Sequence, residues 1–152
     1  MAALAQRCDL LVLTETRETL ERKTTFVKQY YRSHWYVSSF IDQFKGGIGI
    51  LIKHSFCERF GVSCHEDLLN CWDVLIEGRL GRLRLQGNEG SLDVFAVYMD
   101  PASKLEQCNS VARLAGSIDR RVHSLITGDF NFVEASLIVG GKTDLDGLLV
   151  RM

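Results

Sequence analysis

Residues 124–131 read Ser-Leu-Ile-Thr-Gly-Asp-Phe-Asn, an apolar run followed at once by a polar turn. The run predicts a buried β-strand that stops near Asp129. Asp129 and Asn131 lie two residues apart beyond that strand end, so both side chains can point into one cleft. A carboxylate that accepts a proton, beside an amide that offers a neutral hydrogen bond, suits chemistry on a phosphate ester.

A second apolar run lies far upstream, at residues 9–14, and it ends on Glu15. Its continuous apolar composition predicts a strand that is buried on both faces. Oxygen ligands hold hard cations, so a carboxylate at this strand end can bind Mg²⁺. If the strands lie side by side, Glu15 and Asp129 reach one rim of the sheet, where open sheets commonly place their sites.

The sequence between these runs predicts further helices and strands in mixed order. Residues 46–52 predict a glycine-led strand rather than a nucleotide loop, because they lack the Lys-Ser/Thr of a phosphate-binding loop and the spacing of a dinucleotide fingerprint. A turn signal at residues 87–90 predicts a hairpin over 79–98. The remaining elements are expected as helices over 17–31 and 102–122 and strands over 35–40 and 71–76. This mixture indicates an α/β sandwich.

Residue spacing predicts which faces of these elements are buried. In the strand at 79–85, Leu83 and Leu85 fall on one side and Arg82 and Arg84 on the other. The helix at 102–122 carries an apolar stripe at three- and four-residue steps that begins at Leu105. The arginine pairs 82/84 and 120/121 could contact phosphates, but a solvated face is the simpler interpretation.

Length and composition predict one globular domain over residues 1–152, with 46% hydrophobic and 24% charged residues. The formal net charge of −1 gives no general attraction for nucleic acid, so any phosphate recognition must be local. No stretch approaches the roughly 20 apolar residues of a membrane helix. The first residues do not resemble a secretory leader. We therefore expect an intracellular protein, nuclear or cytoplasmic, with no membrane partner and with an oligomeric state that the sequence does not indicate.

The chain contains five cysteines, an odd number that predicts free thiols in a reducing compartment. Cys57, Cys64 and Cys71 recur at steps of seven, with His65 beside the middle one. Zinc sites usually use pairs that are two to four residues apart. We therefore interpret these residues as ordinary cysteines rather than as metal ligands.

Polar side chains at the expected strand ends form the candidate site: Glu15, Tyr98, Asp129 and Asn131. In phosphodiester hydrolysis a water attacks while charge on the phosphoryl and leaving oxygens is stabilised, and Mg²⁺ can supply that stabilisation. We expect Glu15 to hold Mg²⁺, with Mn²⁺ as an alternative. Asp129 would orient or deprotonate the water, and Tyr98 and Asn131 would hydrogen-bond the phosphate.

Each of these residues also has a purely structural interpretation. A Glu after a strand is commonly a solvated turn residue. Asp and Asn in a turn often bond their own backbone in an Asx-turn. A lone Tyr is commonly a core residue whose hydroxyl reaches the surface. Taken singly, the four residues leave both interpretations open.

Taken together and in order, four motifs resemble the endonuclease/exonuclease/phosphatase superfamily, over roughly residues 8–134. They are Thr14-Glu15-Thr16, Gly46-Gly47-Ile48-Gly49-Ile50, Val97-Tyr98-Met99-Asp100-Pro101 and Gly128-Asp129-Phe130-Asn131. The superfamily includes apurinic endonucleases, retrotransposon endonucleases, deadenylases and inositol-phosphate phosphodiesterases. The resemblance implies a four-layer α/β sandwich.

The same resemblance implies a role for each candidate residue. Glu15 corresponds to the family's metal-binding Glu, and Tyr98 to its phosphate-contacting Tyr. Asp129 corresponds to its catalytic Asp, and Asn131 to its transition-state Asn. The short loops favour the retrotransposon-type endonuclease, which implies a nucleic-acid partner, but the sequence does not choose the phosphoester.

Two elements of the family pattern are missing from this sequence. The family's domain opens with an Asn-bearing strand and closes with a Ser-Asp-His strand, and no Asp-His pair occurs here. Asp144 and Asp146 are late acidic residues without an accompanying His. We expect an incomplete domain: either a Mg²⁺-dependent phosphodiesterase, or a non-catalytic remnant that binds nucleic acid, metal or a protein partner.

Overall fold

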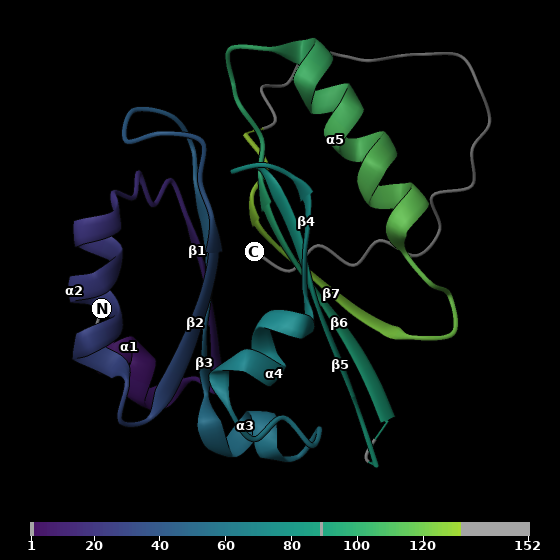
Figure 1. The fold of residues 1–152 in the computed structure, drawn as a ribbon. Helices are drawn as coiled ribbons and strands as arrows, with labels where there is room; N and C mark the ends of the chain where they lie inside the picture. The colour runs from purple at the N-terminus through teal and green to yellow at the C-terminus, as the bar shows by residue number, and fades with distance from the viewer. Residues whose placement is uncertain (1, 89, 132–152) are drawn as a thin grey trace.

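Two β-sheets that face each other form the framework of the chain (Figure 1). The computed structural model describes residues 2–88 and 90–131. The first sheet has the order β1-β3-β2 and the second the order β4-β5-β6-β7. The strands are β1 (Leu10–Thr14), β2 (His34–Ser39), β3 (Ile48–Lys53), β4 (Trp72–Ile76), β5 (Leu80–Gly87), β6 (Gly90–Tyr98) and β7 (His123–Asp129).

Helices cover the outer side of each sheet and one end of the molecule. The helices are α1 (Ala2–Arg7), α2 (Leu20–Tyr30), α3 (His54–Glu58), α4 (His65–Asn70) and α5 (Lys104–Ser117). Figure 1 shows α1 and α2 beside the first sheet, α5 beyond the second, and α3 and α4 together at one end. Thr19 and Ser103 begin the two longest helices, because each hydroxyl accepts a backbone N–H three residues later.

Strand direction decides where the strand ends meet. All pairs in the first sheet are antiparallel. In the second sheet β4, β5 and β6 are antiparallel, whereas β6 and β7 run parallel. A parallel pair needs a crossover connection, which α5 supplies. As a result, β6 and β7 end on the same side of the sheet, where their last residues, Tyr98 and Asp129, are register partners.

The main core lies between the two sheets and follows the alternation of side chains along each strand. Its fully buried members include Ile48, Ile50 and Ile52 from β3 and Leu83 and Leu85 from β5. The intervening residues point outward to two smaller cores. One joins the first sheet to α2 through Tyr30 and Tyr36, and the other joins the second sheet to α5 through Phe95 and Leu114.

The predicted mixed α/β class is confirmed by the two sheets and their helices. The strand from residue 9 is not fully buried as predicted, since every residue of β1 is half-buried. The reason is its place at the edge of the described sheet, where only β3 pairs with it. Helices α1, α3 and α4 were not predicted, because they are too short to show a clear apolar period.

The predicted apolar stripe of the long helix is wrong in phase. Leu105 is 72% exposed, whereas Ser110 and Leu114 face the sheet. The Gln107 side chain donates a hydrogen bond to the Asp100 carbonyl, which fixes the start of α5 in this orientation. The helix also ends at Ser117 rather than near residue 122. Asp144 and Asp146 lie outside the described residues.

None of the helices in the described part of the chain is long and apolar enough to cross a bilayer. All five cysteines are free thiols. Cys57 is fully buried in the main core, while Cys64 and Cys108 are exposed. Burial raises the pKa of the Cys57 thiol to about 12, which keeps it protonated and unreactive at neutral pH.

Tyr36→Phe tests the contact between the first sheet and the loop before α2. The Tyr36 hydroxyl and Ser38 both donate to the buried Glu18 carboxylate. We expect Tyr36→Phe to lower the free energy of unfolding by about 1–3 kcal/mol, because a buried carboxylate loses one donor. Urea unfolding followed by circular dichroism measures the change.

Tyr31→Phe is the matched control, because it removes the same hydroxyl from an exposed tyrosine. Its expected effect is within about 0.5 kcal/mol. Equal losses in the two variants would show that the Glu18 contact contributes nothing to stability.

Candidate functional site

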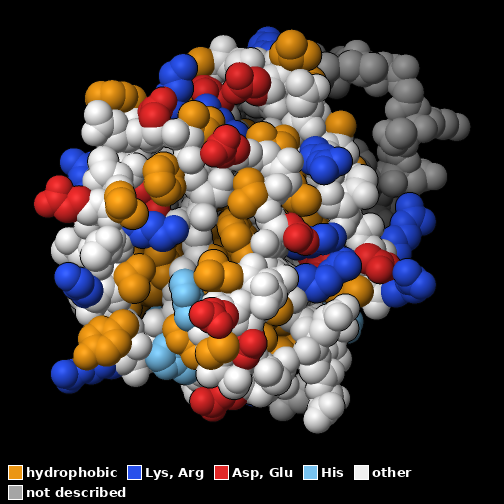
Figure 2. Space-filling view, viewed as in Figure 1, with side chains coloured by type: hydrophobic (Ala, Val, Ile, Leu, Met, Phe, Trp, Pro, Cys, Tyr) orange, Lys and Arg blue, Asp and Glu red, His pale blue; other side chains and the backbone are white. Residues whose placement is uncertain are grey.

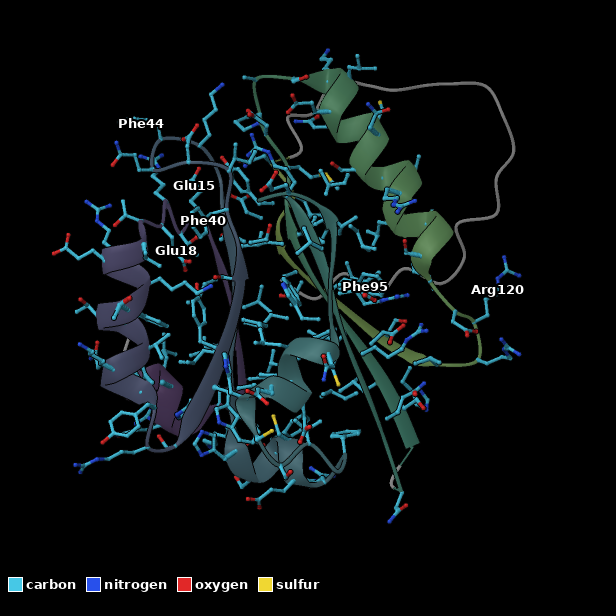
Figure 3. The ribbon with its side chains drawn as sticks, in the orientation of Figure 1. Glu15, Glu18, Phe40, Phe44, Phe95 and Arg120 are labelled. Carbon is cyan, nitrogen blue, oxygen red and sulfur yellow. The ribbon has the colours of Figure 1, made fainter. Side chains whose placement is uncertain are left out.

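The candidate site lies where β1, β6 and β7 end. Glu15 follows β1, Tyr98 and Asp129 are the last residues of β6 and β7, and Asn131 follows two positions later. Across the gap between the sheets, β1 packs against both β6 and β7. Figure 3 shows Glu15 at the same end of the molecule as the loop that carries Phe40 and Phe44. The structure therefore brings the four predicted residues to one end of the fold.

A hydrogen bond between two of the candidate residues joins the two sheets at this end. The Tyr98 hydroxyl donates to Glu15 Oε1 over 2.8 Å, between residues 83 positions apart. Tyr98 is only 6% exposed and belongs to the main core, whereas the Glu15 side chain is 44% exposed. The buried ring thus carries its hydroxyl to the surface, where it orients a carboxylate that solvent can reach.

Asp129 and Asn131 are both tied to the neighbouring strand and turn. Asp129 Oδ1 accepts the Asn131 backbone N–H at 3.1 Å, and Asn131 Nδ2 donates to the Met99 carbonyl at 2.9 Å. These are the turn bonds that the structural interpretation predicts. They leave Asp129 Oδ2 and the second N–H of the Asn131 amide without a hydrogen-bond partner among the described residues, so both groups retain capacity for a ligand.

Alternation along the strands places Asp129 on the inner side of its sheet. Phe95 and its register partner Ile126 belong to the outer core. Tyr98 and Asp129, three positions further along each strand, therefore face the opposite side, toward the first sheet. Glu15 meets Tyr98 from that first sheet. Tyr98 and Asp129 therefore share the face toward the first sheet, from which Glu15 reaches the Tyr98 hydroxyl.

The close contact between β7 and β6 explains why the residue before Asp129, Gly128, is a glycine. Its φ is +146°, and a Cβ atom there would overlap the Val97 carbonyl oxygen. Only a residue without a side chain lets β7 approach β6 so closely. Any larger residue would displace the strand end that carries Asp129.

Glu15 and Asn131 both have left-handed backbone conformations, with φ of +50° and +43°. Asn adopts this region more readily than most residues, but for Glu it is uncommon and costs about 1–2 kcal/mol. Strained residues of this kind cluster at functional sites, where the surrounding structure holds them in place. Here the backbone N–H groups of Thr16 and Arg17 donate to Gly47 and Gly46, which holds the Glu15 loop.

Arg79 is a component of the site that sequence reasoning missed. Its guanidinium lies 4.9 Å from the centroid of the Tyr98 ring and forms a 2.7 Å ion pair with Asp100. The Arg79 side chain is only 8% exposed. The alternation of side chains along the strand could have revealed it. Arg79 is an even number of residues from the inward-facing Leu83 and Leu85, so its charged side chain lies on the buried face.

The surroundings of Tyr98 disfavour its ionisation. Burial, and then the hydrogen bond to Glu15 and its negative charge, raise the pKa of the Tyr98 phenol above its ordinary value. The positive charge of Arg79 opposes this shift. The phenol therefore keeps its proton at neutral pH and remains a donor to Glu15.

The residues at this end fit one kind of magnesium site and not another. Among residues 2–88 and 90–131, no group of three His, Cys, Asp or Glu side chains could enclose a metal ion. A site made only of protein ligands is therefore not formed by the described part of the chain. Mg²⁺ is, however, often held by one or two carboxylates together with substrate phosphates and water. Glu15 is a candidate for that second arrangement: Tyr98 holds its Oε1, and its Oε2, which lies 3.5 Å from Arg17 Nη2 in an exposed ion pair, would exchange this partner for the metal.

The arginines considered from the sequence do not form a basic surface. Arg82 pairs with Asp73, Arg84 with Asp93, and Arg121 with Asp119. Figure 2 shows Lys and Arg side chains intermingled with Asp and Glu over the viewed face. Arg120 lies in the loop between α5 and β7, away from Glu15 (Figure 3). Arg120 and Arg121 are exposed, as the solvated-face interpretation predicts, whereas Arg82 and Arg84 are half-buried in their ion pairs.

Comparison with known proteins does not assign the chain. No family model matches the sequence, and no curated protein matches it.

Glu15→Gln tests the hydrogen bond at the centre of the site. Removing the Glu15 charge should lower the pKa of Tyr98 toward its ordinary value of about 10, because the phenolate no longer faces a carboxylate. Tyrosinate absorbance measures the titration in metal-free buffer, with Tyr98→Phe subtracted to isolate this phenol. Because the Tyr98 pKa is higher in the folded than in the unfolded protein, this group adds to the free energy of unfolding. The contribution is complete below about pH 10 and is lost as the pH rises through the pKa of Tyr98 in the folded protein.

Glu58→Gln is the control, because Glu58 lies in α3 at the opposite end of the molecule (Figure 1). This variant should leave the Tyr98 titration unchanged. An unchanged Tyr98 titration in Glu15→Gln would show that the two side chains are not in contact in solution.

Proposed function

We propose that this end of the two sheets catalyses Mg²⁺-dependent hydrolysis of a phosphodiester, as an endonuclease-like domain of the endonuclease/exonuclease/phosphatase type. The observation that carries the proposal is the Tyr98–Glu15 hydrogen bond. It joins two of the four motifs on which the sequence resemblance rests. The other catalytic motif lies beside it, because Asp129 is the register partner of Tyr98.

The arrangement of layers supports a four-layer α/β sandwich as the underlying fold. Two sheets share the main core, while α2 packs through Tyr30 on the outer side of one and α5 through Leu114 on the outer side of the other. In open α/β sheets, ligands commonly bind outside the carboxyl ends of the strands. The positions of Glu15, Tyr98 and Asp129 agree with that expectation.

Glu15 is the residue we assign to the metal, which would be Mg²⁺ or Mn²⁺. A bound divalent ion would stabilise negative charge on the phosphoryl and leaving oxygens. Tyr98 fixes the carboxylate through its hydroxyl, so its first role is to orient Glu15. Direct contact between Tyr98 and a phosphate, which the sequence predicted, remains a prediction.

Asp129 and Asn131 would act on the water and the phosphate. Asp129 Oδ1 is used in its turn, which leaves Oδ2 to orient or deprotonate an attacking water. Asn131 donates one amide N–H to Met99 and retains a second for a phosphoryl oxygen. The turn bonds therefore position both side chains without consuming the groups that the reaction needs.

Nucleic acid is the substrate class we propose, with retrotransposon-type endonucleases as the nearest functional analogy. The net charge of −1 means that binding would rely on local contacts rather than on a broad positive field. A cavity of about 320 Å³ beside Glu15 contains both Arg22 and Lys23 in its lining. Of the four candidate residues only Glu15 lines this cavity, so Arg22 and Lys23 would contact a phosphate on the α2 side of Glu15.

A non-catalytic function is the second candidate, and one observation favours it. Glu15, Asp129 and Asn131 all form hydrogen bonds within the chain, so each already has a structural role. A fold of this kind could bind nucleic acid, metal or a protein partner without turnover. Catalysis, rather than binding, is therefore the property to test.

Asp129→Asn tests the proposed reaction. It preserves the Asx-turn, because an amide oxygen can still accept the Asn131 N–H, but it removes the charge that would activate water. We expect hydrolysis of plasmid, abasic-site DNA or poly(A) in Mg²⁺ to fall about 100-fold or more. Gel electrophoresis of the products measures the rate, and addition of a chelator should abolish it.

Asp119→Asn is the matched control. Asp119 also accepts a backbone N–H from the second residue after it, Arg121, but it precedes β7 and so lies at the other end of that strand. This variant should retain the wild-type rate. Equal rates in both variants, or no Mg²⁺-dependent product above the Asp129→Asn background on any substrate, would support the non-catalytic alternative.

A further inference from the structure

We propose that Arg79 is a positioning residue that holds the Tyr98 hydroxyl against Glu15. The arrangement of these three residues is a property of the fold, and its consequence for catalysis rests on the proposed function. Among the described residues, the partners of the Arg79 side chain are Asp100 and the Tyr98 ring rather than Glu15. It acts through the ring of Tyr98.

Arg79 contacts Tyr98 through both its backbone and its side chain. The Arg79 carbonyl accepts the Tyr98 N–H at 2.7 Å, which extends the ladder between β5 and β6 by one bond. Its guanidinium carbon lies 4.9 Å from the centroid of the Tyr98 ring. A cation at this distance is attracted to an aromatic face, and the attraction is stronger where water is excluded.

Asp100 locks the guanidinium in place over the ring. Its Oδ2 accepts from Arg79 Nη2 at 2.7 Å, and its Oδ1 accepts the Ala102 N–H, so the carboxylate is itself fixed by the turn. Asp100 lies two residues after Tyr98 on the same strand exit. The guanidinium is therefore held between the ring and a carboxylate that both belong to one short segment.

Two glycines connect the turn that carries Arg79 to the loop that carries Glu15. Gly47 donates to the Gly78 carbonyl at 3.0 Å, and on their other side Gly46 and Gly47 accept from Arg17 and Thr16. Gly46 has φ of +61°, and a Cβ atom there would lie 2.7 Å from Arg79 Nη1. The absence of side chains lets the arginine and the Glu15 loop approach the same stretch of backbone.

Stability alone gives a poor explanation for an arginine at this position. Arg79 lies on the inward face, and its Nη1 is buried without a hydrogen-bond partner among the described residues. An unsatisfied buried donor is unfavourable, and an apolar side chain in such a place is often as stable or more so. A planar cation over the ring explains the choice, because it restrains the tilt of Tyr98 and thus the direction of its hydroxyl.

The test is a set of double-mutant cycles on the full chain. The coupling between Tyr98 and Glu15 is measured by urea unfolding of the wild type, Tyr98→Phe, Glu15→Gln and the double variant. The same four proteins are then made with Arg79→Lys, which keeps the charge but loses the planar group. We expect the coupling to fall toward zero in the Arg79→Lys background. A coupling that is equal in both backgrounds would overturn the proposal, even if all four proteins become less stable.

Asp100→Asn keeps the test decisive if Arg79→Lys does not fold. This variant retains the arginine and the tyrosine but removes the charge that anchors the guanidinium. It should reduce the Tyr98–Glu15 coupling below the value measured in the wild-type background. An Asp100→Asn protein that folds and keeps the full coupling would also count against Arg79 as the positioning group.

Hydrolysis rates separate this proposal from the proposed function. In an active chain Arg79→Lys should lower kcat about 10- to 100-fold with little change in KM, and it should have no further effect once Tyr98→Phe is present. The phenyl ring of Tyr98→Phe can still stack on the Arg79 guanidinium. If Arg79→Lys lowered kcat only by disturbing the local packing, it would lower kcat in Tyr98→Phe as well as in the wild type. If the chain hydrolyses no substrate but the Tyr98–Glu15 coupling still depends on Arg79, the positioning role of Arg79 is upheld and only the enzymatic function is refuted.

Discussion

The candidate site depends on the parallel pairing of β6 and β7, because this pairing places the carboxyl ends of both strands next to each other. Tyr98 and Asp129 are register partners there. Gly128 permits the close approach, since any side chain would overlap the Val97 carbonyl. The second sheet therefore presents a phenol and a carboxylate side by side, on the face that packs against the first sheet.

The first sheet completes the site through a hydrogen bond between two candidate residues, at the end of a largely apolar interface. Ile48, Ile50 and Ile52 meet Leu83 and Leu85 between the sheets, and this burial supplies the cohesion. At the end of the interface the Tyr98 hydroxyl reaches Glu15, whose backbone is held in a left-handed conformation. The packing of the sheets thus determines a hydrogen bond on which the proposed chemistry relies.

Sequence patterns were most reliable where burial follows a short local period. The alternation of leucines and arginines in β5 predicted the inward side of the strand, and the run before Glu15 predicted β1. The same kind of reasoning was wrong for α5, where the exposed Leu105 belonged to the expected buried stripe. A capping hydroxyl and the Gln107 contact with Asp100 set the phase of that helix, and neither follows from apolar spacing.

The sequence by itself determined the strands and the polar residues at their ends, because these follow from side-chain type and neighbouring positions. Only the tertiary structure decided that Tyr98 meets Glu15, that Arg79 lies over the Tyr98 ring, and that β1 is an edge strand in the described sheet. These contacts depend on strand order, direction and register. Such properties arise when segments far apart in the chain pack together, and no local pattern encodes them.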